Sequence, residues 1–479
     1  MAYRDLKEFI ARLKEAGELK EISRPVDPHL EITEIADRAV KRGGPALLFT
    51  NVTGHSMPVL INQFGTASRM CLALRAESFE ELSRRVESLV SLQPPVGMKD
   101  KLHAVRRFVG LAGLRPRRVR RGACQEVVFT GDEVDLGRLP VLQCWPLDAG
   151  RYITLPLVFT RHPETGRRNV GMYRLQVFDR NTTGMHWHLH KDAAEHYRQC
   201  GGRLEVAVAI GTDPALTYAA TAPLPAQVDE MAFAAFLRGA PVEMVACKTV
   251  DLEVPAHAEI VLEGYVDLEE RRREGPFGDH TGYYSLADDY PVFHVTALTH
   301  RRDPIYATTI VGQAPMEDTY LAKATERLFL PLLRLMLPEV VDMDLPKEGG
   351  FHNCVLVSMK KSYPLQARKV MHSLWGTGQL QFSKCIVVVD AEVDVHDYAQ
   401  VAWRVFNNVD WRRDVTLVDG PLDVLDHSSP RPLWGGKIGI DATIKWPEEG
   451  HHREWPPDVE MSADIKARID ELWPLLGLE

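Results

Sequence analysis

The sequence predicts a mixed α/β protein with an N-terminal α/β unit, a β-rich central region and a C-terminal α/β region. Three observations predict this class. The chain has 479 residues, which is more than one hydrophobic core usually serves. Short β-branched runs, separated by Gly, Pro or Asp, recur over residues 122–310. Beyond residue 340, strand-like and helix-like segments alternate, which is typical of an α/β domain.

The N-terminal region shows helical and strand periodicity in turn. Residues 5–16 place four apolar side chains on one helical face. Two apolar runs, PALLFTNV and MPVLINQF, indicate short strands joined by a turn, and a helical pattern follows over 78–92. The Arg/Pro run at 115–122 is typical of a solvated linker. The first unit is therefore expected to span 1–115.

The central region, expected over 116–312, is predicted to be a barrel or sandwich-like β domain. Its strand candidates include ITLPLVFT, LEVAVAIG, EIVLEGYV and FHVTALTH. Residues 316–337 then indicate a long helix, with a bend at Pro331 because proline cannot donate the usual backbone hydrogen bond. This helix lies within a segment, 313–340, that would link two domains.

The C-terminal region, expected over 341–479, contains two buried-strand candidates, CVLVSMK and KCIVVVD. Between and after them lie the helix candidates ARKVMHSLWG and VHDYAQVAWRVFNN. The chain ends in an amphipathic helix that begins after a capping serine, Ser462. Docking of this helix on a neighbouring subunit and docking on its own domain both remain open.

Composition narrows the class of protein. The net charge is −9, which gives no electrostatic basis for binding nucleic acid. No stretch is long and apolar enough to cross a membrane, and the N-terminus lacks the apolar core of a signal peptide. The seven cysteines are scattered and form no CxxC pair. We therefore expect reduced thiols and a cytoplasmic protein.

Three alternating histidines raise the first functional hypothesis. His186, His188 and His190 would share one face of an extended strand. Glu195 follows five residues later, and the HLHKDAAE segment resembles the first metal motif of cupins. Imidazole and carboxylate ligands suit Mn, Fe or Zn. One candidate function is therefore a metal-dependent oxygenase that uses His188, His190 and Glu195.

A second candidate site is the stretch EGPFGDHTGYY at 274–284. Glu274 and Asp279 flank a turn of Gly-Pro-Phe-Gly, which allows both carboxylates to face one cavity. Paired carboxylates in a cleft can separate their pKa values, so that one serves as a proton donor. A plain surface turn is the alternative, and the aromatic residues within this stretch make that alternative less attractive.

Two further segments contain possible anion-binding groups. In NVGMYR, Gly171 permits close approach to the backbone, and Arg174 can hold a carboxylate or phosphate. In GGKIGIDATIKWP, a Gly-Gly-Lys turn can bind phosphate, although its spacing is not that of a P-loop. Each signal is weak alone.

Taken together, these segments resemble the UbiD family of decarboxylases. Six segments carry the resemblance in the family's order and spacing: NVGMYRLQV, MHWHLHKD, EVPAHAEIVLEGYV, EGPFGDHTGYY, KVMHSLWG and GGKIGIDATIKWP with the REWP that follows. The resemblance implies a split β-barrel flavin-binding domain, joined by a helix to a C-terminal α/β oligomerisation domain. It also implies prenylated FMN, supplied by a flavin prenyltransferase, and assembly into a homodimer or homohexamer.

The resemblance also assigns residues to the cofactor site. A divalent metal, Mn²⁺ or Mg²⁺, would anchor the flavin phosphate, often with K⁺ nearby. Its ligands would be Asn169, His190 and Glu230, and not Glu195. The implied cofactor contacts are Met172, Tyr173, Arg174, His186, Trp187, His188, Lys191, Asp192 and Lys437.

The implied catalytic set is Arg174, Glu274 and Asp279. The implied reaction is reversible, non-oxidative decarboxylation of an aromatic acid, hydroxybenzoate-like or heteroaromatic, with release of CO₂. Arg174 would orient the substrate carboxylate, Asp279 would protonate the carbon, and Glu274 would hold Arg174. The chain is more similar to the hydroxybenzoate branch, which includes ubiquinone and menaquinone precursors, although His186 replaces an arginine common there.

One spacing requires a particular backbone path. Asn169 and Arg174 are five residues apart, so a straight strand would point them to opposite faces. Both can serve one site only if the strand bulges or ends between them, and Gly171 is the natural place.

Overall fold

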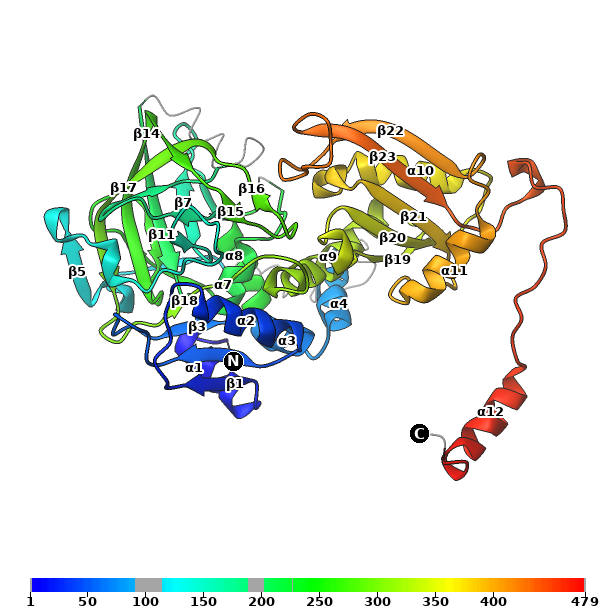
Figure 1. The fold of residues 1–479 in the computed structure, drawn as a ribbon, viewed down its shortest axis with the longest axis horizontal. Helices are drawn as coiled ribbons and strands as arrows, with labels where there is room; N and C mark the ends of the chain where they lie inside the picture. The colour runs from blue at the N-terminus through cyan, green and yellow to red at the C-terminus, as the bar shows by residue number, and fades with distance from the viewer. Residues whose placement is uncertain (1, 91–113, 188–201, 226, 478–479) are drawn as a thin grey trace, which may run out of the picture.

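The computed structural model describes residues 2–90, 114–187, 202–225 and 227–477. Two bodies lie side by side, joined by the helix α9 (Glu317–Met336) (Figure 1). The three-part mixed α/β fold predicted from the sequence is confirmed. Five of the predicted site residues, His188, His190, Lys191, Asp192 and Glu195, lie outside the described residues.

The N-terminal unit contains a four-stranded sheet whose last strand comes from a distant part of the sequence. The sheet order is β1-β2-β3-β18. Its strands are β1 (Leu19–Ile22), β2 (Ala46–Phe49), β3 (Val59–Ile61) and β18 (Tyr306–Ala307). Its helices are α1 (Leu6–Glu15), α2 (Glu31–Lys41), α3 (Ala67–Leu74) and α4 (Phe79–Val90). The pairing of β18 with β3 fixes this unit to the end of the central domain.

The central domain is built on a seven-stranded sheet in which β14 and β17 are the longest strands. The path is β10-β17-β14-β11-β7-β8, with β5 also paired to β17. The strands are β5 (Val127–Thr130), β7 (Leu157–Arg161), β8 (Arg168–Met172), β10 (Thr182–Gly184), β11 (Arg203–Ile210), β14 (Ile260–Glu274) and β17 (Asp288–His300). Within the described residues, β8 and β10 do not pair, so this sheet is open there.

Apolar side chains on both faces explain why these runs form a sheet inside the domain. Side chains of β7 and β11 alternate between an inner core and an outer core. The outer core is covered by α7 (Pro214–Ala219) and α8 (Glu230–Arg238). Small sheets complete the domain: β4 (Arg117–Val119) with β12 (Glu243–Ala246) and β13 (Glu253–Pro255), β6 (Tyr152–Ile153) with β9 (Leu175–Gln176), and β15 (Phe277–Gly278) with β16 (Tyr284–Ser285).

The C-terminal domain is a five-stranded sheet between two helices. Its order is β19-β20-β21-β23-β22, and the three central strands are parallel. The strands are β19 (Val340–Asp344), β20 (Cys354–Met359), β21 (Cys385–Asp390), β22 (Val415–Pro421) and β23 (Trp434–Asp441). Helices α10 (Gln366–Trp375) and α11 (Tyr398–Asn408) pack on opposite faces, as the two separate cores show.

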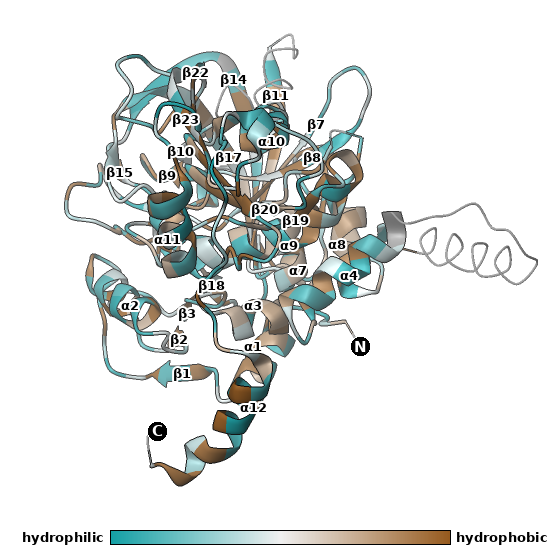
Figure 2. Cartoon of the chain, turned by 90° about the vertical axis from the view of Figure 1, so that its right-hand side faces the viewer, coloured by the Kyte–Doolittle hydropathy of each residue, from teal (hydrophilic) through white to brown (hydrophobic). Residues whose placement is uncertain are grey.

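The long linking helix and the last helix both form where the sequence predicts them. Helix α9 continues through Pro331 to Met336. The last helix, α12 (Ala463–Leu472), stands clear of the body and buries none of its residues. Figure 2 shows apolar positions on this isolated helix. No helix in the described part of the chain has the length and apolar character needed to span a membrane.

Candidate active site

The strand β8 ends where the sequence required it to end. Asn169 lies within β8, whereas Tyr173 and Arg174 follow its last residue, Met172. Gly171 is the position that makes this path possible. A Cβ atom there would lie 2.5 Å from the Tyr173 ring, so the ring occupies the space beside the glycine. Tyr173 is buried in the connection between β8 and β9.

Arg174 gathers three partners from distant parts of the chain. Its Nε donates to Glu274 Oε1 at 3.0 Å, its Nη1 to Asp279 Oδ2 at 2.6 Å, and its Nη2 to Ser285 Oγ at 3.0 Å. The guanidinium carbon also lies 4.6 Å from the centre of the Phe277 ring. The side chain is 9% exposed. The predicted catalytic residues Arg174, Glu274 and Asp279 are therefore in direct contact.

Glu274 is held from its other side by His186. The Nδ1 of His186 hydrogen-bonds Glu274 Oε2, and the His186 ring stacks on Tyr290 at 4.1 Å. Burial lowers the pKa of His186, and the hydrogen bond to Glu274 opposes this only in part. Burial opposes ionisation of Glu274, but the hydrogen bond from His186 and the charge of Arg174 lower its pKa overall. A neutral His186 therefore donates to an ionised Glu274.

Asp279 is held by Arg174 on one oxygen and by His280 on the other. Oδ1 lies 3.0 Å from His280 Nδ1 and accepts from the His280 backbone N–H at 2.8 Å. Burial opposes ionisation, but the hydrogen bond and charge of His280, together with the charge of Arg174, hold the pKa of Asp279 well below its usual range. Asp279 is therefore a carboxylate in this arrangement.

The turn that carries Asp279 is tied down by a buried carboxyl group, Asp148. Its Oδ1 accepts from the Gly278 N–H and its Oδ2 from the Trp145 N–H, both at 2.8 Å. Burial raises the pKa of Asp148 to about 6, although these hydrogen bonds favour the charged form. Asp148 therefore positions the turn between Glu274 and Asp279.

Sequence reasoning missed several of these side chains. Phe277, His280 and Ser285 lie in or directly after the EGPFGDHTGYY stretch, whose density of aromatic and polar residues was the available signal. Tyr290 and Asp148 belong to no motif that the sequence displayed. Their roles depend on β15, β16 and β17 folding over the segment that carries Arg174.

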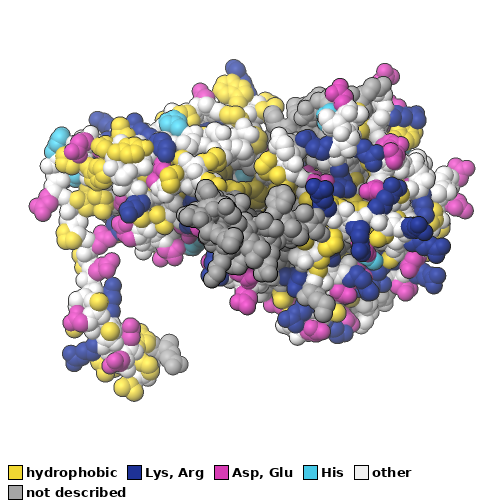
Figure 3. Space-filling model, turned by 180° about the vertical axis from the view of Figure 1, so that it is seen from behind, with side chains coloured by type: hydrophobic (Ala, Val, Ile, Leu, Met, Phe, Trp, Pro, Cys, Tyr) yellow, Lys and Arg dark blue, Asp and Glu magenta, His cyan; other side chains and the backbone are white. Residues whose placement is uncertain are grey.

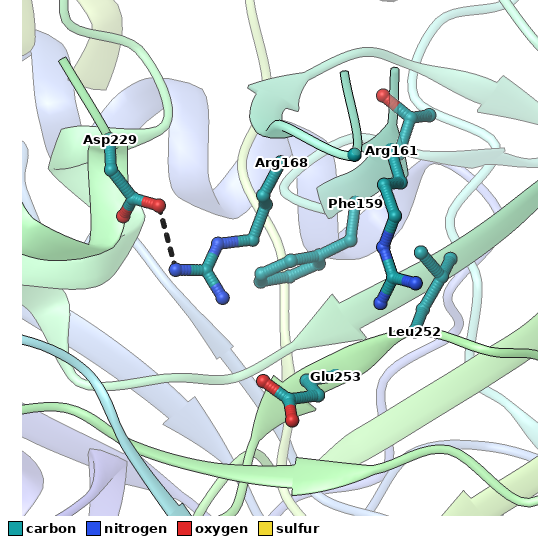
Figure 4. A pocket seen from close by; sticks show the side chains of 8 residues that line it. Phe159, Arg161, Arg168, Asp229, Leu252 and Glu253 are labelled. Atoms are coloured by element: carbon teal, nitrogen blue, oxygen red, sulfur yellow. Dashed lines mark hydrogen bonds and ion pairs between the residues drawn. The ribbon is translucent and has the colours of Figure 1, made fainter. Parts of the chain in front are cut away.

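Two of the three predicted metal ligands lie on neighbouring elements. Asn169 is in β8, and Glu230 is the first residue of α8. The residues that precede them, Arg168 and Asp229, form an ion pair at 2.7 Å (Figure 4). A cavity of about 370 Å³ beside this pair is lined by residues of β7, β8, the N-cap of α8 and the start of β13, and neither Asn169 nor Glu230 is among its lining residues.

The donor set fits a hard divalent cation. The Asn169 side chain is 6% exposed, and its amide nitrogen has no hydrogen-bond partner among the residues that the structure describes. Since an amide can flip, an oxygen can occupy the same place. Amide and carboxylate oxygens are the ligands that Mg²⁺ and Mn²⁺ prefer. Asn169 and Glu230 therefore offer the kind of donor atoms that the predicted metal takes, while the third predicted ligand, His190, lies outside the described residues.

A different carboxylate cluster is already neutralised by basic side chains. Glu326, Asp344 and His396 lie close enough together to hold an ion. However, Lys323 Nζ donates to both carboxylates, at 3.0 Å in the case of Glu326, and Arg327 adds a second cation. This cluster therefore joins α9 to the C-terminal domain as a network of ion pairs.

Three other predicted cofactor contacts, Trp187, Met172 and Lys437, lie within the described residues. Trp187 is 6% exposed, and Met172 is half-buried at the end of β8. Lys437 lies on β23, where its Nζ donates to the Gln381 carbonyl of its own domain. Burial lowers the pKa of Lys437 to about 8.

Comparison with known proteins identifies the family across most of the chain. Three domains described for 3-octaprenyl-4-hydroxybenzoate carboxy-lyase, UbiD, match in order. The N-terminal domain matches residues 10–88, the Rift-related domain 117–314 and the C-terminal domain 319–442. An uncharacterized protein of Archaeoglobus fulgidus is 53% identical over 478 residues, which is 99% of this chain and 98% of that protein.

Solved structures give the same result. The UbiD-class enzyme HmfF of Pelotomaculum thermopropionicum, in complex with FMN, is 32% identical with a TM-score of 0.80 and covers 95% of this chain and 97% of its own. An evolved dimeric form of that enzyme is described with prFMN. The vanillic acid decarboxylase of Sedimentibacter hydroxybenzoicus, in closed form, is 29% identical with a TM-score of 0.86 and covers 100% of both chains. With this match in sequence, domain order and fold, the chain belongs to the UbiD family of carboxy-lyases.

Proposed function

We propose that this protein catalyses the reversible, non-oxidative decarboxylation of an aromatic acid with prenylated FMN as cofactor. The observation that carries the proposal is the buried contact of Arg174 with Glu274 and Asp279. The substrate is hydroxybenzoate-like or heteroaromatic, with prenylated 4-hydroxybenzoate as one candidate, and CO₂ is released. The reaction takes place in the cytoplasm, as expected for a chain whose six described cysteines are all free thiols.

Each residue of the site has a separate role in the proposed reaction. Arg174 pairs with the substrate carboxylate, and Glu274 keeps its guanidinium group oriented. When bound, prenylated FMN supplies the electron sink for the charge left on the ring carbon. Asp279 then delivers a proton to that carbon. His186 holds Glu274 and stacks on Tyr290. We propose that His186 also contacts the substrate.

The cofactor site combines a metal with direct contacts. Asn169 and Glu230, with His190, would hold Mn²⁺ or Mg²⁺ against the flavin phosphate, with K⁺ nearby. The remaining contacts would come from Met172, Tyr173, Arg174, His186, Trp187, His188, Lys191, Asp192 and Lys437. A flavin prenyltransferase would supply the cofactor, and the enzyme would act as a homodimer or homohexamer.

The oxygenase alternative makes a different prediction about the metal. It requires Glu195, whereas the decarboxylase requires Glu230. The three-domain match to UbiD favours the decarboxylase. Metal content, measured by mass spectrometry, should be lost in Glu230→Ala and retained in Glu195→Ala; the reverse result would favour the oxygenase.

The central test uses protein co-expressed with a flavin prenyltransferase. The purified protein should show the absorption of a bound flavin. It should also decarboxylate at least one acid from a panel of 4-hydroxybenzoate, 3,4-dihydroxybenzoate, vanillate and a furan carboxylate. Glu274→Gln should bind flavin but lose at least about 100-fold of that activity. Absence of flavin, together with full activity of Glu274→Gln, would refute the proposal.

A further inference from the structure

The geometry of Asp279 leaves the source of its proton open. Its two oxygens face Arg174 Nη1 at 2.6 Å and His280 Nδ1 at 3.0 Å. Both partners stabilise the carboxylate, so Asp279 carries no proton before the reaction. A group that must protonate carbon therefore needs a neighbour that holds the proton until it is required.

His280 is placed to be that neighbour. It is 15% exposed, and its Nδ1 faces Asp279. Its ring packs against two rings of the C-terminal domain, Phe351 at 5.0 Å and His352 at 5.2 Å. Its Nε2 is buried and makes no hydrogen bond within the described chain. His280 therefore lies between the catalytic carboxylate and the facing domain.

The charges around His280 favour its protonated form. Asp279 lies beside it, and the charges of Asp318 at the start of α9 and of Asp423 after β22 act in the same direction. Burial raises the pKa of Asp318 to about 7, so Asp318 is only partly charged near neutral pH and Asp279 is the main partner. Burial lowers the pKa of His280, but the hydrogen bond and charge of Asp279, with the two further aspartates, raise it overall. Burial and the charge of His280 lower the pKa of His352 to about 4, so this second ring is neutral near pH 7.

We propose that His280 is a positioning residue that stores the proton which Asp279 delivers to the substrate carbon. This inference rests on the proposed function and extends it. The proton moves from His280 Nδ1 to Asp279 Oδ1, and Asp279 passes it to the ring carbon. The electron pair of the broken bond to CO₂ becomes the new C–H bond. His280 is left neutral and regains a proton from water, so one proton is consumed per CO₂ released.

The first test separates proton delivery from CO₂ release in the flavin-loaded enzyme. His280→Asn keeps an N–H donor near the Nδ1 position but cannot release a proton. With an acid that the wild type decarboxylates, net product formation should fall at least about 100-fold. Exchange of ¹³C from labelled bicarbonate into the carboxyl group of the same acid needs no proton and should stay within about threefold.

The pH profile and a control variant add two further readouts. The alkaline decline in net activity, expected as His280 loses its proton, should disappear in the variant. His257→Asn is the matched control, because His257 also binds a carboxylate, Glu243, at 2.9 Å in the same domain but on its surface. It should leave both rates unchanged. Equal loss of both rates in His280→Asn, or loss of neither, would overturn the proposal.

The second test needs neither flavin nor substrate. In flavin-free protein labelled with ¹⁵N-histidine, the His280 signal is identified by its absence from His280→Asn. In Asp279→Asn the same signal should titrate at least about one pH unit lower, since the paired carboxylate is gone. An unchanged titration would overturn the proposal. A wild type that turns over no acid would instead refute the proposed function, and this titration would still decide whether the pair exists.

Discussion

At the residue scale, the site depends on the three N–H directions of one guanidinium group. The sequence identified Arg174, Glu274 and Asp279 through family resemblance, and two of them through their turn chemistry. It could not identify Ser285 as the third partner, because that contact joins positions 111 residues apart. The pairing of β15 with β16 places Ser285 opposite Phe277, and sequence periodicity contains no such information.

Replacing Arg174 by lysine should therefore be far from conservative. A lysine keeps the charge, but its single ammonium group cannot donate in the three directions that the planar guanidinium group of Arg174 uses. We expect Arg174→Lys to lose at least about 100-fold in decarboxylation and about 3 kcal/mol in unfolding free energy. Turnover of an accepted acid and urea denaturation measure the two effects.

Arg203→Lys provides the control for this substitution. Arg203 also pairs with a carboxylate, Asp267 at 3.3 Å, and also lies over an aromatic ring, Tyr265 at 4.2 Å. Its side chain is 62% exposed, so its replacement should change stability by no more than about 0.5 kcal/mol. Similar losses for both variants would show that burial of the Arg174 cluster is not what matters.

At the scale of elements, periodicity predicted local structure and missed long-range pairing. The predicted N-terminal helix, the two strands that follow it and the long linking helix correspond to α1, β2, β3 and α9. The parallel pairing of β18 with β3 was not predictable, because nearly 250 residues separate Val59 from Tyr306. Such pairing is set by packing of whole units, and a two-residue strand carries no periodic signal of its own.

Glu317 ties the start of α9 to the N-terminal unit and to the segment after β18, and its removal tests this junction. Glu317 accepts from the Phe64 N–H at 2.8 Å, the Asn62 N–H at 3.1 Å and the Thr309 hydroxyl at 2.6 Å. Glu317→Ala would leave these buried donors unpaired, at about 1–3 kcal/mol each. We expect unfolding free energy, measured in urea, to fall by at least about 3 kcal/mol.

Glu8→Ala is the matched control for the helix junction. Glu8 also lies in the first turn of a helix and accepts one backbone hydrogen bond, from Arg4 N at 2.7 Å, but it is exposed. Its loss should cost no more than about 1 kcal/mol. If Glu317→Ala costs no more than Glu8→Ala, the buried carboxylate is not what fixes α9.

At the scale of the whole molecule, the C-terminal domain presents apolar side chains that the described part of the chain leaves exposed. Phe406 on α11 is 74% exposed and Leu417 on the edge strand β22 is 75% exposed. Yellow apolar side chains are visible over this domain in Figure 3. The sequence left open whether the last helix packs on its own domain, and in the structure α12 buries none of its residues against the described part of the chain. Exposed apolar patches of this kind are typical of surfaces between subunits.

A second copy of the chain is therefore the partner we expect for α12. Its apolar side chains include Ile465, Ile469 and Leu472, while Lys466 and Arg468 are polar positions of the same helix. Light scattering should give the wild type a mass of at least twice 54.0 kDa. Replacing the three apolar residues by serine should weaken assembly at least about tenfold, because buried apolar area would be lost. Replacing Lys466 and Arg468 by alanine should not, and a monomeric wild type, or equal effects of the two variants, would show that this helix does not hold subunits together.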